Sequence, residues 1–210
     1  MENPTIEELQ NSENYVLVHE LEHNNIREFI MKQIASGSKL IKGFMYYQLL
    51  MIITGIFFTT RPLVLAVKGD FTPLFYLMLA VVFTFSFLIL AHELFHALAF
   101  KLTGAPKVSI GAYLKKFIFY AEADRHVINR KQFTFVALAP LISVKILTGI
   151  AILLTASTPV VFFWIFIMCV HSLFCAGDIG MIDFINNSSG NHLYTFDIKE
   201  EKKSYFYSEK

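Results

Sequence analysis

The sequence is poor in charge, in cysteine and in net charge of either sign. Only 17% of its 210 residues are Asp, Glu, Lys or Arg, against about 25% in an ordinary soluble domain. Lys and Arg together number 18 and Asp and Glu 17, so the net charge is +1, which excludes a nucleic-acid binder driven by net charge. Two cysteines exclude the disulfide framework of a small secreted protein.

Long hydrophobic runs, by contrast, are abundant. Hydrophobic residues make up 55% of the chain, which excludes a disordered protein. Four apolar stretches, at 44–67, 73–100, 133–156 and 159–179, reach the ~20 residues that a helix needs to cross a bilayer. The sequence therefore predicts an all-α polytopic membrane protein, with about four transmembrane helices and a short β-rich cytoplasmic loop between the second and the third.

The basic residues predict how these helices are oriented. Four lie in residues 1–42, seven in the 101–131 loop and four in the C-terminal tail, while the opposite side has only Arg61 and Lys68. By the positive-inside rule, both termini and the central loop are expected in the cytoplasm of a multi-pass protein of the cell membrane. The acidic N-terminal segment has no signal-peptide pattern, so we expect the first span to act as the insertion signal.

Three shorter patterns predict structure outside the spans. Tyr15 to Val18 is typical of a short strand, and residues 26–41 could form an amphipathic helix on the membrane surface. Residues 108–123 are rich in β-branched and aromatic side chains around Gly111 and Lys115-Lys116, which predicts one or two strands at the cytoplasmic surface.

One motif carries recognisable chemistry: His92-Glu93-Leu94-Phe95-His96 fits H-E-x-x-H. On a helix, positions four apart lie on one face, so both imidazoles can bind one Zn²⁺. Zinc lowers the pKa of a bound water to about 7. Glu93, about 100° round the helix, can then take a proton from that water and pass it to a leaving amine.

A second match, His19-Glu20-Leu21-Glu22-His23, has a different context. It follows the strand-like residues that begin at Tyr15 and has no apolar helix to hold its side chains, so we interpret it as a solvated polar segment. The first match lies among apolar residues, where each charged group costs about 2.5–3.5 kcal/mol on insertion scales. A metal ion would offset that cost, although a helix end among lipid head groups is an alternative.

A zinc site needs a third protein ligand, and the fourth span offers candidates. His171, Cys175 and Asp178 are spaced i, i+4, i+7 along one helical stripe. Counting residues from the outer surface places Asp178 at the depth of His92, so Asp178 is the preferred ligand. His171 would lie about 10 Å higher, and its alternative role is a hydrogen-bonded polar residue between helices.

The remaining candidates rank lower. Cys175 could be a soft ligand, but a buried apolar cysteine is commoner, and we interpret Asp183 and Glu122 as surface carboxylates. Lys145 lies inside the third span, where it can snorkel to the cytoplasmic surface. The alternative for Lys145 is a cation that stabilises an oxyanion or pairs with Asp178.

The spacing of these groups resembles the site-2 protease class of intramembrane zinc metalloproteases and, more closely, a small bacterial family of putative zincin peptidases. The residues that carry the resemblance are His92-Glu93-Leu94-Phe95-His96-Ala97, Gly104-Ala105-Pro106, Arg130-Lys131-Gln132-Phe133, Ala137-Leu138-Ala139-Pro140 and Gly177-Asp178-Ile179. The resemblance implies that His92, His96 and Asp178 are metal ligands and Glu93 the catalytic residue. It also implies that the 108–123 loop receives substrate. The Ile179 that follows the Asp departs from the Asp-Gly usual in the site-2 class.

The sequence thus predicts three segments and one activity. The segments are a polar cytoplasmic segment (1–42), a membrane metalloprotease-like domain (43–182, with the β-rich loop at 107–124) and a cytoplasmic tail (183–210). The activity is zinc-dependent hydrolysis of peptide bonds in a membrane-anchored protein or peptide, within a lipid bilayer and without nucleic acid. The alternatives are a non-catalytic metal-binding protein and a metal-free one, with a structural, sensing or transport role.

Overall fold

The computed structural model describes residues 3–11, 13–113, 118–188, 190 and 192–210. Four helices in this part of the chain are long and apolar enough to cross a membrane, as the sequence predicts. They are Lys39–Val67, Thr72–Leu102, Arg130–Thr155 and Val161–Asn187. A β-sheet accompanies them, so the prediction of an all-α chain is right for the spans and wrong for the rest.

The chain divides into two compact units. The first, here called the sheet unit, comprises residues 1–41, 93–139 and 177–210. The second, the helical unit, comprises residues 42–92 and 140–176.

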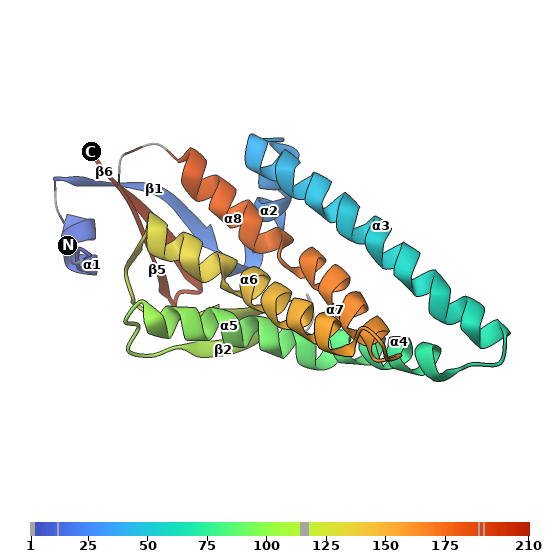
Figure 1. The fold of residues 1–210 in the computed structure, drawn as a ribbon. Helices are drawn as coiled ribbons and strands as arrows, with labels where there is room; N and C mark the ends of the chain where they lie inside the picture. The colour runs from blue at the N-terminus through green and yellow to red at the C-terminus, as the bar shows by residue number, and fades with distance from the viewer. Residues whose placement is uncertain (1–2, 12, 114–117, 189, 191) are drawn as a thin grey trace. The chain divides into compact units, whose positions relative to one another are not determined.

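The helical unit is built around α4 (Thr72–Phe83) and α7 (Val161–Phe174), which pack side by side (Figure 1). Phe83 and Phe163 meet edge to face with ring centroids 5.4 Å apart. A Cβ at Gly55 of α3 (Lys39–Val67) would lie only 3.3 Å from the Cβ of Cys169, so α3 approaches α7 closely. Small residues of this kind let helix backbones pack where lipid offers no hydrophobic drive.

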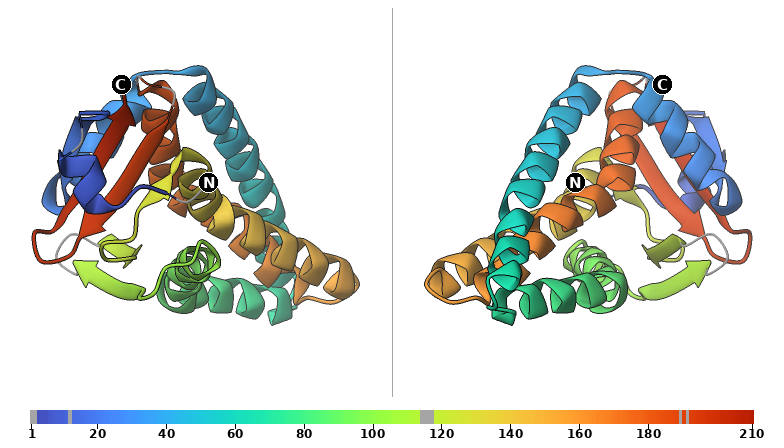
Figure 2. Two further views of the ribbon diagram at one scale, coloured as in Figure 1. Left: turned by 90° about the vertical axis from the view of Figure 1, so that its left-hand side faces the viewer. Right: turned by 90° about the vertical axis from the view of Figure 1, so that its right-hand side faces the viewer.

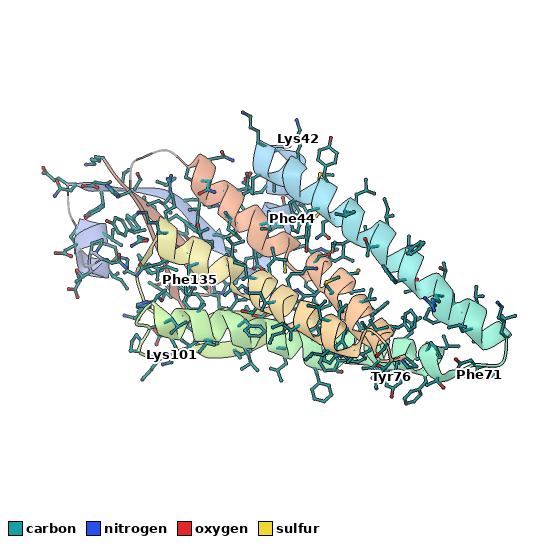
Figure 3. All side chains as sticks on the ribbon, viewed as in Figure 1. Lys42, Phe44, Phe71, Tyr76, Lys101 and Phe135 are labelled. Atoms are coloured by element: carbon teal, nitrogen blue, oxygen red, sulfur yellow. The ribbon has the colours of Figure 1, made fainter. Side chains whose placement is uncertain are left out.

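Most of the surface of α3 is apolar and exposed. Only 6% of its most hydrophobic 18-residue window is buried, and rings such as Tyr46 and Phe57 are 75% and 68% exposed. Figure 3 shows side chains projecting along this helix, which begins near the labelled Lys42 and Phe44. Soluble proteins rarely leave so large an apolar face uncovered.

A turn of π-helix, η2 (Thr84–Leu88), joins α4 to α5 (Ile89–Leu102). The Thr84 hydroxyl donates to the Ala80 carbonyl at 2.8 Å, and the Ser86 hydroxyl donates to the Val82 carbonyl at the same distance. Both hydroxyls thus donate to helical carbonyls around the π-turn. Such π-turns within helices are often found at functional sites.

The sheet unit contains a four-stranded antiparallel sheet in the order β1-β6-β5-β4. Its strands are β1 (Tyr15–Glu22), β6 (Lys203–Glu209), β5 (Leu193–Ile198) and β4 (Ile128–Asn129). Strand β1 confirms the strand predicted at Tyr15 and extends it to Glu22. Figure 2 shows the paired C-terminal strands in red. The apolar and aromatic residues of β5 and β6 bury Phe196 and Phe206 almost completely, so the C-terminal segment is structural.

A separate hairpin forms from β2 (Ser109–Tyr113) and β3 (Ile118–Glu122), with Ser109 opposite Glu122. This confirms the strands predicted in the central loop; Lys115 and Lys116 lie outside the described residues. The Lys199 ammonium lies 3.2 Å from the Glu122 carboxylate and 2.9 Å from the Ser109 hydroxyl. The C-terminal segment therefore anchors this hairpin.

The predicted helix at 26–41 is shorter than expected. It forms α2 (Ile26–Ala35) and ends before Gly37, whose φ of 65° requires glycine-like freedom. Ser38 then begins α3: its hydroxyl accepts from the Ile41 N–H at 3.1 Å. Side chains of α2 pack on α8 (Ala176–Asn187).

The other described elements are short or continue a span. α1 (Ile6–Asn11) packs beside β1, and η1 (His23–Asn25) is a single 3-10 turn before α2. The third long helix is α6 (Arg130–Thr155), which contains Pro140.

Candidate metal centre

Helix α5 presents the H-E-x-x-H motif. His92 and His96 lie one turn apart on the helix and so share a face. His92, Glu93 and His96 are 6%, 6% and 9% exposed. The alternative, in which the motif lies at a helix end among lipid head groups, does not agree with this burial. Three buried polar side chains within five residues need partners, because burying an uncompensated ionisable group is costly.

In the sheet unit, His96 lies against Asp178 of α8. Its Nε2 is 3.2 Å from Asp178 Oδ1, and its Nδ1 is 3.0 Å from the Val136 carbonyl oxygen on α6. A carbonyl can only accept a hydrogen bond, so Nδ1 carries the proton. In the neutral imidazole, the lone pair of Nε2 therefore points toward the Asp178 carboxylate.

This arrangement fits a zinc site. Either of two arrangements makes this contact favourable: a proton on Nε2, which pairs an imidazolium with the carboxylate, or a metal ion between the two atoms. Ligands about 2.0–2.1 Å from a tetrahedral zinc ion are about 3.3 Å apart, and the His96 and Asp178 atoms are 3.2 Å apart. His and Asp side chains here thus form possible metal-binding groups, and His92 belongs to the same helical face as His96.

A second possible group lies within the helical unit. His92 Nδ1 is 3.1 Å from His171 Nε2, and the Cys175 sulfur is 3.8 Å from His171 Nδ1. Ligand atoms of these three buried residues lie within 4.8 Å of one another. His171 is thus hydrogen-bonded between two helices, which is the alternative role considered for it from the sequence. Cys175 is buried, as expected for an apolar cysteine.

Two carboxylates predicted to be at the surface are buried instead. Asp183 is 2% and Glu122 3% exposed. The Ser38 hydroxyl donates to Asp183 at 2.5 Å, while Lys199 pairs with Glu122. The prediction was wrong because the partners of both groups come from distant segments, which local spacing does not reveal.

Lys145 does not snorkel freely to the surface. Its ammonium group donates to the Met168 carbonyl, lies 3.5 Å from the Met51 sulfur and lies 5.4 Å from the centre of the Tyr47 ring. It thereby links α6, α7 and α3. A cation held this way satisfies its charge inside the helical unit.

The second H-E-x-x-H match lies mainly on a strand. His19 belongs to β1, where it stacks on Phe29 with centroids 5.1 Å apart. His23 is buried, and its Nε2 lies 3.3 Å from the Ser204 hydroxyl. The segment is therefore only partly solvated: Glu20 and Glu22 are exposed as predicted, while Leu21 and His23 are buried.

Sequence reasoning missed the polar cluster around Asp197 on β5. Ser204 donates to Asp197 at 2.5 Å, and His23 Nε2 lies 4.0 Å away. Burial raises the pKa of Asp197, and the nearby carboxylates Glu122 and Asp124 raise it further, against the hydrogen bond from Ser204 and the charge of His23. No local sequence pattern reveals this cluster, because its residues come from segments near both ends of the chain.

The comparisons with known proteins agree with this chemistry. Residues 85–191, half of the chain, match a family described as putative zincin peptidases. The chain belongs to that family, as its motifs suggested. No curated protein and no solved structure matches it. The family's description supports a zinc metallopeptidase.

Proposed function

We propose that this protein is a membrane-embedded zinc metallopeptidase. His92, His96 and Asp178 would hold the zinc ion, and Glu93 would be the catalytic residue. The observation that carries the proposal is the position of Asp178, whose carboxylate oxygen lies 3.2 Å from His96 Nε2 while the Val136 carbonyl engages the other ring nitrogen. A zinc ion bound there would activate a water molecule and polarise the scissile carbonyl.

Membrane embedding is supported by the apolar surface. Large side chains on α3, α4 and α5 are more than half exposed, among them Phe57, Phe75 and Leu98. Figure 3 labels Phe71, which is 65% exposed and directly precedes α4, and Tyr76, which lies on α4. Exposing these apolar surfaces to water costs free energy, and contact with lipid acyl chains would remove that cost.

The protein's own residues have distinct tasks in the proposed reaction. His92 and His96 present ring nitrogens from one helical face, and the carboxylate of Asp178 adds negative charge. Glu93 follows His92 directly and is equally buried, so its carboxylate works in a low-dielectric setting. There it would accept a proton from the attacking water and deliver it to the departing amine nitrogen.

The substrate proposed is a membrane-anchored protein or peptide in extended form. The hairpin of β2 and β3 forms a sheet of its own, and a strand edge of this kind can pair with an extended peptide. Main-chain hydrogen bonds would then hold the substrate with little dependence on its side chains.

The central experiment replaces Glu93 by Gln in the full chain. We expect zinc content to stay at the wild-type level while peptide hydrolysis falls to background, because Gln keeps the shape but cannot accept the proton. Glu28→Gln is the matched control, since Glu28 is an exposed carboxylate paired only with Lys32 on α2. Hydrolysis that persists in Glu93→Gln would remove Glu93 from its role.

A second candidate is a non-catalytic metal site formed by His92, His171 and Cys175, which also lie within ligand distance of one another. The two candidates differ in the residues that zinc binding needs. The peptidase predicts that Asp178→Ala loses zinc and that Cys175→Ala keeps it, and the second candidate predicts the reverse. Cobalt substitution gives a further readout, because a thiolate ligand produces intense charge-transfer absorption.

A further inference from the structure

Pro140 lies inside α6 with its side chain less than 2% exposed. In an α-helix, the N–H of residue i donates to the carbonyl of residue i−4. Proline has no N–H, and its ring pushes against that same carbonyl. The carbonyl that Pro140 deprives of its helical donor is therefore that of Val136.

The Val136 carbonyl is also the group that contacts the zinc motif. His96 Nδ1 lies 3.0 Å from it, and Val136 is itself only 4% exposed. A buried carbonyl needs a donor, and the His96 ring supplies one. The same contact places a proton on His96 Nδ1 and orients the ring so that Nε2 is directed at Asp178.

We infer that Pro140 is a positioning residue for the candidate metal centre. It keeps the Val136 carbonyl available to His96 Nδ1, and so holds the His96 ring in the orientation that directs Nε2 at Asp178. A side chain or carbonyl that orients a metal-binding histidine typically controls metal affinity 10–100-fold. The part of this inference that concerns zinc rests on the proposed function, while the hydrogen bond of His96 Nδ1 can be tested without metal.

The chain offers a matched control in Pro62, which lies inside α3 in the same way. Replacing either proline by Ala restores a helical N–H and should stabilise its helix. Only the restored N–H at position 140 would compete with His96 for its acceptor. A purely structural role for Pro140 predicts the same outcome for both variants.

The experiment compares Pro140→Ala and Pro62→Ala in the full chain in detergent. For Pro140→Ala we expect a higher midpoint of thermal unfolding without zinc, together with zinc affinity about 10–100-fold weaker by chelator competition. Pro62→Ala should change the midpoint only. In the zinc-free protein labelled with ¹⁵N-histidine, long-range ¹H–¹⁵N spectra should show a hydrogen-bonded proton on His96 Nδ1. Pro140→Ala should lose this hydrogen-bonded Nδ1–H signal. His96→Gln assigns the signal.

Wild-type zinc affinity and an unchanged His96 Nδ1–H signal in Pro140→Ala would overturn the inference. If Pro140→Ala does not fold, Pro140→Val, which keeps the buried volume and also restores the N–H, answers the same question. Asp178→Ala separates this inference from the proposed function. Zinc bound normally by Asp178→Ala would refute the proposed site, whereas zinc lost by that variant and kept by Pro140→Ala would refute the role of Pro140 alone.

Discussion

At the scale of single residues, the candidate centre depends on how its imidazoles are held. His96 has a backbone carbonyl on one nitrogen and a carboxylate opposite the other. His92 has the ring of His171 on Nδ1. Each histidine of the motif thus has a ring nitrogen engaged by a buried group, which limits rotation of the ring.

Asp197 gives a prediction at the same scale. Its pKa is raised in the folded protein, so the fold favours the protonated carboxyl. This contribution to stability is complete below the unfolded pKa, about 3.9, and is lost as pH rises through the higher folded pKa. Asp197→Asn keeps an acceptor for Ser204 and cannot ionise, so we expect it to gain stability relative to wild type as pH rises.

Thermal unfolding of both proteins between pH 4 and pH 8 measures this difference. Asp70→Asn is the control, because Asp70 is an exposed carboxylate elsewhere in the chain that accepts from the Thr72 N–H at 3.1 Å. Unfolding midpoints of Asp197→Asn that follow the wild type at every pH would contradict the prediction.

At the scale of elements, the N-terminal helix α2 supports the helix that carries Asp178. A Cβ placed on Gly180 would lie 3.3 Å from the Cγ2 of Ile30, and one on Gly177 would lie 3.5 Å from its Cδ1. These two glycines let α2 pack directly on α8. The N-terminal segment therefore helps to hold α8 in the sheet unit.

Gly180→Val tests this packing. We expect the added methyl groups to displace α2, because Ile30 already occupies the space beside Gly180, at a cost of about 1–3 kcal/mol for overpacking. Trypsin should then cut faster at Arg27 and Lys32. Gly43→Val is the matched control, since no atom lies within 4 Å of a Cβ there. Equal cleavage rates in the two variants would contradict the claim that α2 supports α8.

At the scale of the whole molecule, the predicted topology places both termini and the central loop on the cytoplasmic side of the membrane. The orientation rests on the distribution of basic residues and stays a prediction. Both native cysteines are buried, so a cysteine introduced at an exposed position can report on it. Thr158, between the last two spans, and Glu200, between β5 and β6, are both exposed.

Thiol labelling of intact cells makes the topology measurable. We expect Thr158→Cys to react with a membrane-impermeant maleimide from outside, and Glu200→Cys to react only after the cells are permeabilised. The positive-inside rule places position 200 in the cytoplasm. Labelling of Glu200→Cys in intact cells would reverse the proposed orientation.

The sequence alone determined the features that depend on local pattern. Apolar runs of ~20 residues defined the four long helices, and the 3.6-residue period put His92 and His96 on one face. The β-branched and aromatic residues of the central loop predicted its strands. Counting along the spans also suggested that Asp178 lies near the motif, and the structure brings its carboxylate to His96.

Only the tertiary structure decided the features that join distant segments. The C-terminal strands complete a sheet with Tyr15–Glu22, which makes the apparent solvated segment part of a strand with Leu21 buried. Asp183 and Glu122 are buried because their partners come from far along the chain. The contact between His96 and the carbonyl preceding Pro140 by four residues has the same origin. Periodicity specifies which face a side chain occupies, but not which distant group meets that face.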